Sequence, residues 1–147
     1  MKEVKETIDI EAPLATVWAV LMDYKAYPEW NPTIRHLGMK NKVGKKFKLK
    51  LTTPKGRTLK VRPKLLEFKE KDTYRWKGKL LLKAIFTGEH YFEVKANPDG
   101  STTFVQGEIF KGAIVPVMGG VIKDLGQSYV VMNQALKERC EAIAAKS

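Results

Sequence analysis

Two neighbouring stretches decide the fold: IFTGEHYFEVK at residues 85–95 and TTFVQGEIF at residues 102–110. Phenylalanines recur at even-numbered positions of both stretches, and this period of two is typical of half-buried β-strands. The residues between them include NPDGS at positions 97–101, a run of strong turn formers. The pattern therefore predicts an antiparallel hairpin whose even-numbered side chains face the protein core.

The pairing of this hairpin brings polar side chains together on an apolar face. If the turn is centred near Asp99, opposite residues have numbers that sum to about 198. His90 then faces Glu108, and Phe92 faces Gln106. An odd sum would place the aromatic side chains of the two strands on opposite sides of the sheet, so the even register is preferred. We therefore expect the Cβ atoms of His90 and Glu108 to lie about 5 Å apart.

The same alternation extends upstream of the hairpin. It begins at Thr33 and is clearest at residues 46–51, where lysines alternate with apolar side chains. Residues 58–68 and 74–79 repeat it, and residues 4–10 give a first strand near the N-terminus. Together with the hairpin, these stretches predict a seven-stranded antiparallel sheet.

Helical periodicity replaces the alternation in two places. Pro13 is expected to be the first residue of a short helix, and the two prolines in residues 27–32 predict a turn or at most one further helical turn. After Gly112, apolar residues follow one another at spacings of three, four or seven, which predicts one long helix preceded by a turn or bend near Pro116. These apolar positions are Val117, Val121, Leu125, Met132, Leu136, Cys140 and Ile143.

Length, composition and element order limit the class of protein. With 147 residues, 44% of them hydrophobic, the chain is expected to form one domain of the α+β class, with one face of the sheet packed on helix. No stretch of about 20 apolar residues occurs, which favours a soluble, cytoplasmic protein. The single cysteine, Cys140, and the two histidines exclude a disulfide framework and a Cys/His zinc cage. We therefore expect no metal, no cofactor and an inert core thiol at Cys140.

The net charge of +11 is concentrated in the middle of the chain. Residues 40–83 contain 17 basic and 3 acidic residues, an excess of +14. The cations alternate with apolar side chains, so we expect an exposed basic sheet face that lacks the aromatic stacking platform of single-strand binders. No nucleic acid partner is expected, whereas weak contact with an anionic membrane or an acidic protein stays open. The basic sheet face comprises Lys46, Lys48, Lys50, Lys60, Arg62, Lys64, Arg75, Lys77 and Lys79.

Several motifs resemble those of one superfamily. They are Ala12-Pro13 with Val17-Trp18, YPEWNP at 27–32, Val43-Gly44, Trp76-Lys77-Gly78, GEHYF at 88–92, GEIFKG at 107–112 and MNQALK at 132–137. Together they resemble the START-like, Bet v 1-like (SRPBCC) superfamily, in particular its polyketide cyclase/dehydrase-like branch, over nearly the whole chain. The resemblance implies a single domain over residues 1–147 with a helix-grip fold. In that fold a seven-stranded curved sheet surrounds a long C-terminal helix, and two short helices follow the first strand.

The resemblance also implies an apolar cavity between the sheet and the C-terminal helix, suited to lipids, sterols, polyketides or similar molecules. Members include lipid carriers, hormone receptors, cyclases and chaperone partners, so the fold alone assigns no chemistry. We expect Tyr129 to orient the polar end of a ligand, and for most of the other candidates plain core is the alternative. The candidate ligand-binding residues are Leu49, Val61, Trp76, Phe86, His90, Phe92, Phe104, Gln106, Glu108, Met118, Val121, Ile122, Leu125 and Tyr129.

His90 and Glu108 form the candidate catalytic pair. A carboxylate that faces a histidine orients the ring and raises its basicity, as general acid/base chemistry requires. The same pair could instead satisfy its own hydrogen bonds in the core or hold the polar group of a ligand. No other catalytic set is recognised in the sequence.

Three functions stay open at this point. The first is binding of a small hydrophobic or amphipathic ligand, and the second is a cyclase- or aromatase-like enzyme that uses His90 with Glu108. The third is an interaction module that docks through the basic sheet face. Under each hypothesis the protein is expected to be a monomer or a dimer. Trp30 is expected to hold the short helical segment against the sheet, and His36 to lie at the surface or partly exposed with no role.

Overall fold

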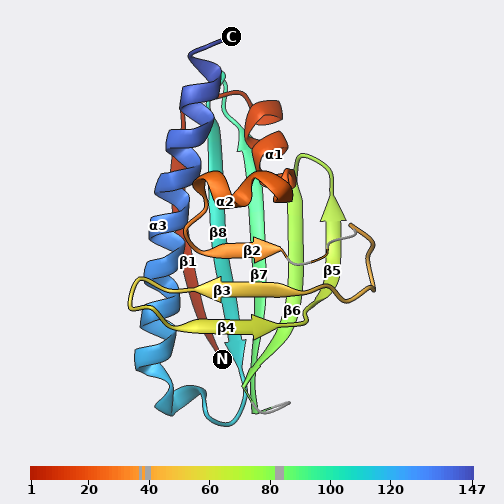
Figure 1. The fold of residues 1–147 in the computed structure, drawn as a ribbon, viewed down its shortest axis with the longest axis vertical. Coiled ribbons are helices and arrows are strands. Elements are labelled where there is room, and N and C mark those ends of the chain that lie inside the picture. Colours follow the sequence, from red (N-terminus) through yellow and green to blue (C-terminus); the bar gives the residue numbers. More distant parts are fainter. Residues whose placement is uncertain (37, 39–40, 82–84) are drawn as a thin grey trace.

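The computed structural model describes residues 1–36, 38, 41–81 and 85–147, which form an α+β fold (Figure 1). A five-stranded antiparallel sheet has the order β1-β8-β7-β6-β5, and a three-stranded antiparallel sheet, β2-β3-β4, runs across it. The long helix α3 lies along the five-stranded sheet, which is the expected helix-grip arrangement. The strands are β1 (Lys2–Ile10), β2 (Ile34–His36), β3 (Leu49–Thr52), β4 (Thr58–Val61), β5 (Lys64–Lys69), β6 (Thr73–Leu81), β7 (Phe86–Ala96) and β8 (Thr102–Lys111).

The helices follow the predicted order. Two short helices, α1 (Leu14–Met22) and α2 (Tyr27–Trp30), lie between β1 and β2 and are joined by the 3₁₀ turn η1 (Tyr24–Ala26). Pro13 has an extended backbone and directly precedes α1. The helix therefore begins at Leu14, one residue later than predicted. The chain ends in α3 (Gly119–Ala144), and the turn predicted ahead of it is the 3₁₀ turn η3 (Val115–Val117).

The apolar stripe of α3 is shorter than the sequence pattern predicts. Its central positions, from Leu125 to Cys140, are buried. Val117 is 80% exposed because it belongs to η3 and not to α3, and Ile143 is 40% exposed in the last turn of the helix. Burial raises the pKa of the Cys140 thiol to about 12, so this cysteine is the core thiol that was expected.

The described residues form eight strands, one more than predicted, because the stretch expected as a single strand at residues 58–68 is divided at Pro63. Proline has no backbone N–H and cannot donate to a ladder, so β4 ends at Val61 and β5 begins at Lys64. The stretch 46–51 is divided as well. Lys46 forms an isolated bridge with Lys64 of β5, whereas β3 pairs with β2 and β4.

The central hairpin of β7 and β8 has the predicted register. His90 is directly opposite Glu108, and Phe92 is opposite Gln106. On the other face of the same hairpin Tyr91 is opposite Gly107, and its ring covers the glycine. The Tyr91 hydroxyl donates a hydrogen bond to Glu3 on β1 at 2.9 Å. The absence of a side chain at Gly107 thus allows an aromatic ring of β7 to cross β8 and reach β1.

The core between the sheets and the helices contains two apolar clusters. The larger one unites α1, α2, the three-stranded sheet and the C-terminal half of α3. The smaller one lies at the other end of α3, against the ends of β7 and β8. Its buried members are Phe86, Phe110, Val115, Ile122, Leu125 and Tyr129.

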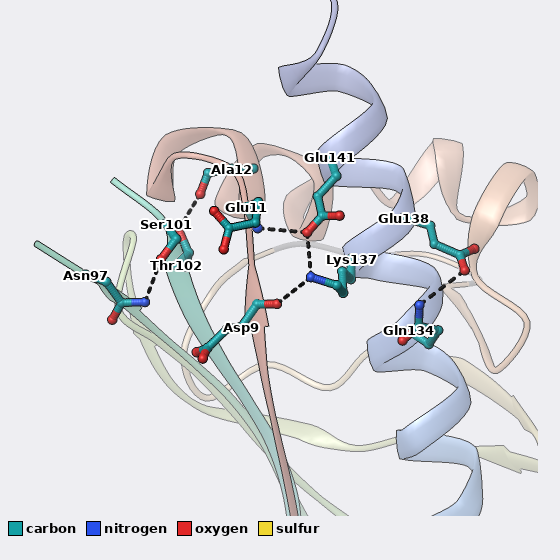
Figure 2. A network of polar contacts seen from close by, with 10 residues as sticks. All are labelled: Asp9, Glu11, Ala12, Asn97, Ser101, Thr102, Gln134, Lys137, Glu138 and Glu141. Carbon is teal, nitrogen blue, oxygen red and sulfur yellow. Dashed lines mark hydrogen bonds and ion pairs between the residues drawn. The ribbon is translucent and has the colours of Figure 1, made fainter. Parts of the chain in front are cut away.

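Polar contacts fix both ends of α3, and Figure 2 shows those near its C-terminus. Near its C-terminus the Lys137 ammonium donates to the carbonyl of Asp9 at 2.9 Å, and a carboxylate oxygen of Glu141 accepts from the backbone N–H of Glu11 at 2.9 Å. Near its N-terminus Asp124 accepts a hydrogen bond from the Thr53 hydroxyl at 2.6 Å, which lowers the pKa of the Asp124 carboxyl. The helix is therefore tied to β1 at one end and to the turn after β3 at the other.

Substitution of Gly107 by alanine is expected to destabilise the fold. A Cβ atom at this position would lie 2.3 Å from the Tyr91 hydroxyl oxygen, so the ring would have to leave its place. We expect Gly107→Ala to lower the free energy of unfolding by about 1–3 kcal/mol in urea titrations. In a Tyr91→Ala background the same substitution should cost nothing, because alanine suits a strand better than glycine. An equal loss in both backgrounds would contradict this account.

Candidate functional site

Five polar side chains meet in the layer between the five-stranded sheet and α3. They are His90 on β7, Gln106 and Glu108 on β8, and Tyr129 and Asn133 on α3, and none is more than 3% exposed. Strand alternation turns the three sheet residues toward the helix. The spacing of four residues stacks the two helix residues on the face that meets the sheet. We call these five residues the buried polar network.

The carboxylate of Glu108 is the centre of the network. Its Oε1 atom lies 2.8 Å from Nδ1 of His90, and the Tyr129 hydroxyl donates to the same oxygen at 2.5 Å. Burial, followed by the proximity of Glu108, raises the pKa of Tyr129 well above its usual value, so this hydroxyl stays a donor. Trp76 stacks on the His90 ring with 4.4 Å between ring centroids and 6° between planes. The imidazole is therefore held in one orientation.

A chain of amide groups determines which atoms of the network carry protons. The carbonyl of Glu6 can only accept, and Nδ2 of Asn133 donates to it at 3.3 Å. The Oδ1 atom of Asn133 then accepts from Nε2 of Gln106 at 2.8 Å, which turns the Gln106 oxygen toward Nε2 of His90 at 2.9 Å. Because that oxygen is an acceptor, Nε2 of His90 carries a proton.

The remaining contact of His90 also requires a proton. With Nε2 protonated, the 2.8 Å contact between Nδ1 and Glu108 is attractive only if one proton lies between them. The pair is therefore an imidazolium with a carboxylate, or an imidazole with a carboxylic acid. In either form both ring nitrogens are bound by the protein, and neither is a bare base ready to accept a proton from a substrate.

The predicted lining residues are divided between the two apolar clusters. Leu49, Val61, Trp76, Phe92 and Phe104 are buried in the larger cluster. Phe86, Ile122, Leu125 and Tyr129 are buried in the smaller one, and Met118 and Val121 are half-buried at its rim. The buried polar network lies between the two clusters. It includes Tyr129 of the smaller cluster, and Trp76 of the larger cluster stacks on its His90.

Four depressions on the described surface have volumes of about 310 to 530 Å³. None of these four is lined by His90, Gln106, Glu108 or Tyr129. One of them, with a volume of about 390 Å³, lies between α1, α2 and the end of α3 and is lined in part by Trp30. Because the network residues are at most 3% exposed, a ligand that reaches them must displace side chains of the core.

Sequence reasoning missed Asn133, although a signal for it existed. Asn133 follows Tyr129 by one helical turn and directly follows Met132 of the apolar stripe, so a polar side chain at this position faces the core. Its importance lies in the contact with the backbone of Glu6 on β1. That contact depends on how α3 is placed against the sheet, which the sequence pattern does not describe.

A second group of interest surrounds His36, the only other histidine. Its ring lies 4.2 Å from the ring of Tyr24 and 5.8 Å from that of Phe47, measured between centroids. Tyr27 packs edge-on against His36 of β2, which attaches α2 to the three-stranded sheet, and against Trp30 within α2 itself. The ring nitrogens of half-buried His36 have no hydrogen-bond partner among the described residues, and burial lowers its pKa to about 3. His36 is therefore neutral in the folded protein at neutral pH.

Comparisons with known proteins agree with this architecture. The family model described as polyketide cyclase / dehydrase and lipid transport matches residues 1–143. None of the curated proteins matches the sequence. In the part of the chain that the structure describes, no helix combines the length and apolar character needed to cross a membrane.

Solved structures with the same fold come from several kinds of protein. A START superfamily protein from Mycobacterium smegmatis has a TM-score of 0.74 and 20% identity, over 96% of this chain and 98% of that chain. Ara h 8.0201 has a TM-score of 0.68 and 18% identity, over 99% of both chains. The di-domain ARO/CYC StfQ from the steffimycin biosynthetic pathway has a TM-score of 0.70 and 16% identity, over 97% of this chain and 51% of that chain. At these identities the similarity is one of fold.

The proton arrangement of the network can be tested by nuclear magnetic resonance. We expect the ¹⁵N spectrum of His90 to show a protonated Nε2 whose hydrogen exchanges slowly with solvent, because the amide chain directs it to Gln106. His36 provides the internal reference, since its ring nitrogens have no hydrogen-bond partner in the part of the chain that the structure describes. A His90 ring with a bare Nε2 would show that the amide chain runs in the opposite sense.

His36 is expected to make the fold sensitive to mild acid. Its pKa is about 3 in the folded protein and about 6.5 in the unfolded chain, so the unfolded chain binds the proton first as the pH falls. Stability is complete above pH 6.5 and declines toward pH 3, at up to about 1.4 kcal/mol per pH unit.

Urea unfolding at pH 7 and pH 5 measures this effect. His36→Phe keeps a ring in the aromatic group and should reduce the difference in stability between the two pH values, because the other titratable groups, including His90, are unchanged. If the wild type and His36→Phe lose the same stability over this interval, another group carries the acid sensitivity.

Proposed function

The chain belongs to the polyketide cyclase / dehydrase and lipid transport family, and we propose that it binds a small apolar or amphipathic molecule between the five-stranded sheet and α3. The observation that carries this proposal is the buried polar network. A folded core of this size does not need five polar side chains in its apolar layer, since well-packed apolar residues are often as stable or more stable. Their presence is explained if they recognise the polar end of a ligand.

The network offers two contacts to such a ligand. The Nε2–H group of His90 points to the Gln106 oxygen. It could donate its hydrogen bond instead to a ligand carbonyl or carboxylate that takes the place of this oxygen. The Tyr129 hydroxyl could rotate from Glu108 to the same ligand group. Because each contact replaces an existing hydrogen bond, the polar end of the ligand supplies selectivity more than affinity.

Affinity would come from burial of the apolar part of the ligand, at roughly 25 cal/mol per Å². The smaller apolar cluster is the best place for it, because it adjoins the network through Tyr129. Its rim includes half-buried Met118 and Val121, next to the glycine pair at the start of α3. Outward movement of this end of the helix would open a path between solvent and the network.

A second candidate is a cyclase- or aromatase-like enzyme, and the 2.8 Å contact between His90 and Glu108 is the observation that favours it. In that role the imidazolium of His90 would give its Nε2 proton to a carbonyl oxygen of a bound polyketide-like chain. The Nδ1 proton would stay on the ring, bound to the Glu108 carboxylate. The step requires the substrate to displace Gln106 from Nε2, so ligand binding precedes chemistry in this proposal too.

The binding proposal is tested by adding ligands to protein purified without detergent. Oleate, cholesterol and an anthraquinone represent the fatty acid, sterol and polyketide classes, and native mass spectrometry with thermal melting reports binding. We expect a 1:1 adduct and a raised melting temperature with at least one class. Tyr129→Phe should change the order of preference among the ligands, because the hydroxyl contact is lost.

Tyr91→Phe is the matched control. It makes the same chemical change on the outer face of the same sheet, where the hydroxyl is bound to Glu3, and should leave ligand preference unchanged. The absence of any adduct or melting shift would overturn the binding proposal. Turnover of a polyketide-like chain that His90→Gln abolishes, with binding retained, would establish the enzyme instead.

A further inference from the structure

A second depression of ligand size lies on the side of the five-stranded sheet that faces away from α3. Its volume is about 530 Å³, and it is formed by β5, β6, the start of β7 and the residues that flank β4 and β5. Strand alternation explains its position. On β6, Trp76 is buried against His90, whereas its neighbour Lys77 is exposed on the opposite face. The lining residues are Lys46, Arg62, Lys64, Leu66, Lys77, Gly78, Lys79 and Thr87.

Among the described residues, five cationic side chains and no carboxylate line this depression. Of the ion pairs that the structure gives for the described residues, none involves these five cations. The nearest carboxylate by strand pairing is Glu89, which is opposite Lys77 but is bound to Arg75 at 2.8 Å. Within the described part of the chain, the five cations of the depression therefore have no ion-pair partner. Lys40 and Lys83, at the limits of the basic segment, lie outside the described residues.

Three of these lysines are placed directly opposite one another across adjacent chain segments. Lys64 pairs with Lys77 in the ladder between β5 and β6, and Lys46 forms an isolated bridge with Lys64 on the other side. Like charges in directly opposite positions destabilise a sheet. An ordinary solvated sheet face would alternate the signs of its charges across the strands. A row of three opposed lysines is thus a cost to the fold that an anionic ligand would relieve.

The local backbone also departs from a regular sheet at this place. The register between β5 and β6 shifts between Leu65 and Glu67, and this irregularity leaves Leu66 37% exposed beside the lysines. Irregularities of this kind are common beside binding sites, where they redirect a side chain. Here Leu66 offers an apolar contact for the carbon part of a ligand.

We propose that Lys46, Arg62, Lys64, Lys77 and Lys79 form a binding site for a small molecule that carries two or more phosphate groups. Phosphates combine high charge with several acceptor oxygens, and lysine and arginine are their usual partners in proteins. This site lies on the opposite face of the sheet from the buried polar network and is independent of the function proposed above.

A small soluble ligand fits the geometry better than a large anionic surface. The cations converge on a depression of small-molecule size and do not spread over a flat face, and pockets for small molecules have volumes of about 300–1,000 Å³. A planar membrane would meet the rim of such a depression before its floor. Single-stranded nucleic acid would need exposed aromatic side chains, and none lines this site.

The test uses inorganic tripolyphosphate as the probe and the full chain as the protein. Isothermal titration calorimetry and thermal melting at about 50 mM salt, where screening is weak, measure binding to the wild type. Lys64→Gln/Lys77→Gln removes one opposed lysine pair from the depression. This double variant should fold, because the substitution relieves repulsion, and its melting temperature without probe should equal or exceed that of the wild type.

Lys50→Gln/Lys60→Gln is the matched control. These two lysines are also directly opposed, on β3 and β4, but they do not line the depression. We expect 1:1 binding to the wild type, weakened at least about tenfold in Lys64→Gln/Lys77→Gln and less than about threefold in the control. Thermal stabilisation by the probe should be lost in the first variant and kept in the second.

Three results would overturn the proposal. No binding of tripolyphosphate to the wild type would show that the opposed lysines have no ligand of this class. Equal weakening in the two double variants would show that the probe responds only to net charge. Binding to vesicles of phosphatidylglycerol and phosphatidylcholine without binding of tripolyphosphate would assign the face to a membrane surface instead.

Discussion

The even register between β7 and β8 is the constraint on which the rest of the interior depends. A slip of one residue would turn Glu108 away from α3 and leave the Tyr129 hydroxyl buried without its acceptor. It would also move Gly107 from beneath the Tyr91 ring and place a side chain there. The register therefore serves both faces of the sheet at once. Unsatisfied buried groups on one face and a steric clash on the other would penalise any alternative pairing.

Sequence reasoning succeeded where the alternation of side chains along a strand fixes the face on which each residue lies. The alternation of aromatic residues located the hairpin and paired His90 with Glu108, because a strand has a fixed period of two. It failed at Pro63, where the side-chain pattern continues through a residue that lacks a ladder donor. It also failed at Asn133, whose role depends on a backbone carbonyl of β1 far away in the sequence. Periodicity describes which way side chains point, whereas such contacts depend on how separate elements are placed.

The same strands carry chemistry of opposite character on their two faces. On β6, Trp76 stacks on the buried imidazole while Lys77 lies in a cationic depression. The alternation along the strand thus places apolar side chains in the interior and cationic side chains on the outer face. The functions proposed for the two faces share a scaffold without sharing a side chain, so substitutions can address them separately.

The interruption at Pro63 separates two sheets as well as adding a strand. Residues 44–47 bond to the chain around Pro63 and Leu65, which attaches them to β5, whereas β3 and β4 pair with each other. Lys48 links residues 44–47 to β3, and Arg62-Pro63 links β4 to β5. Side-chain packing in the larger apolar cluster, more than a continuous ladder, therefore holds the three-stranded sheet against the rest of the fold.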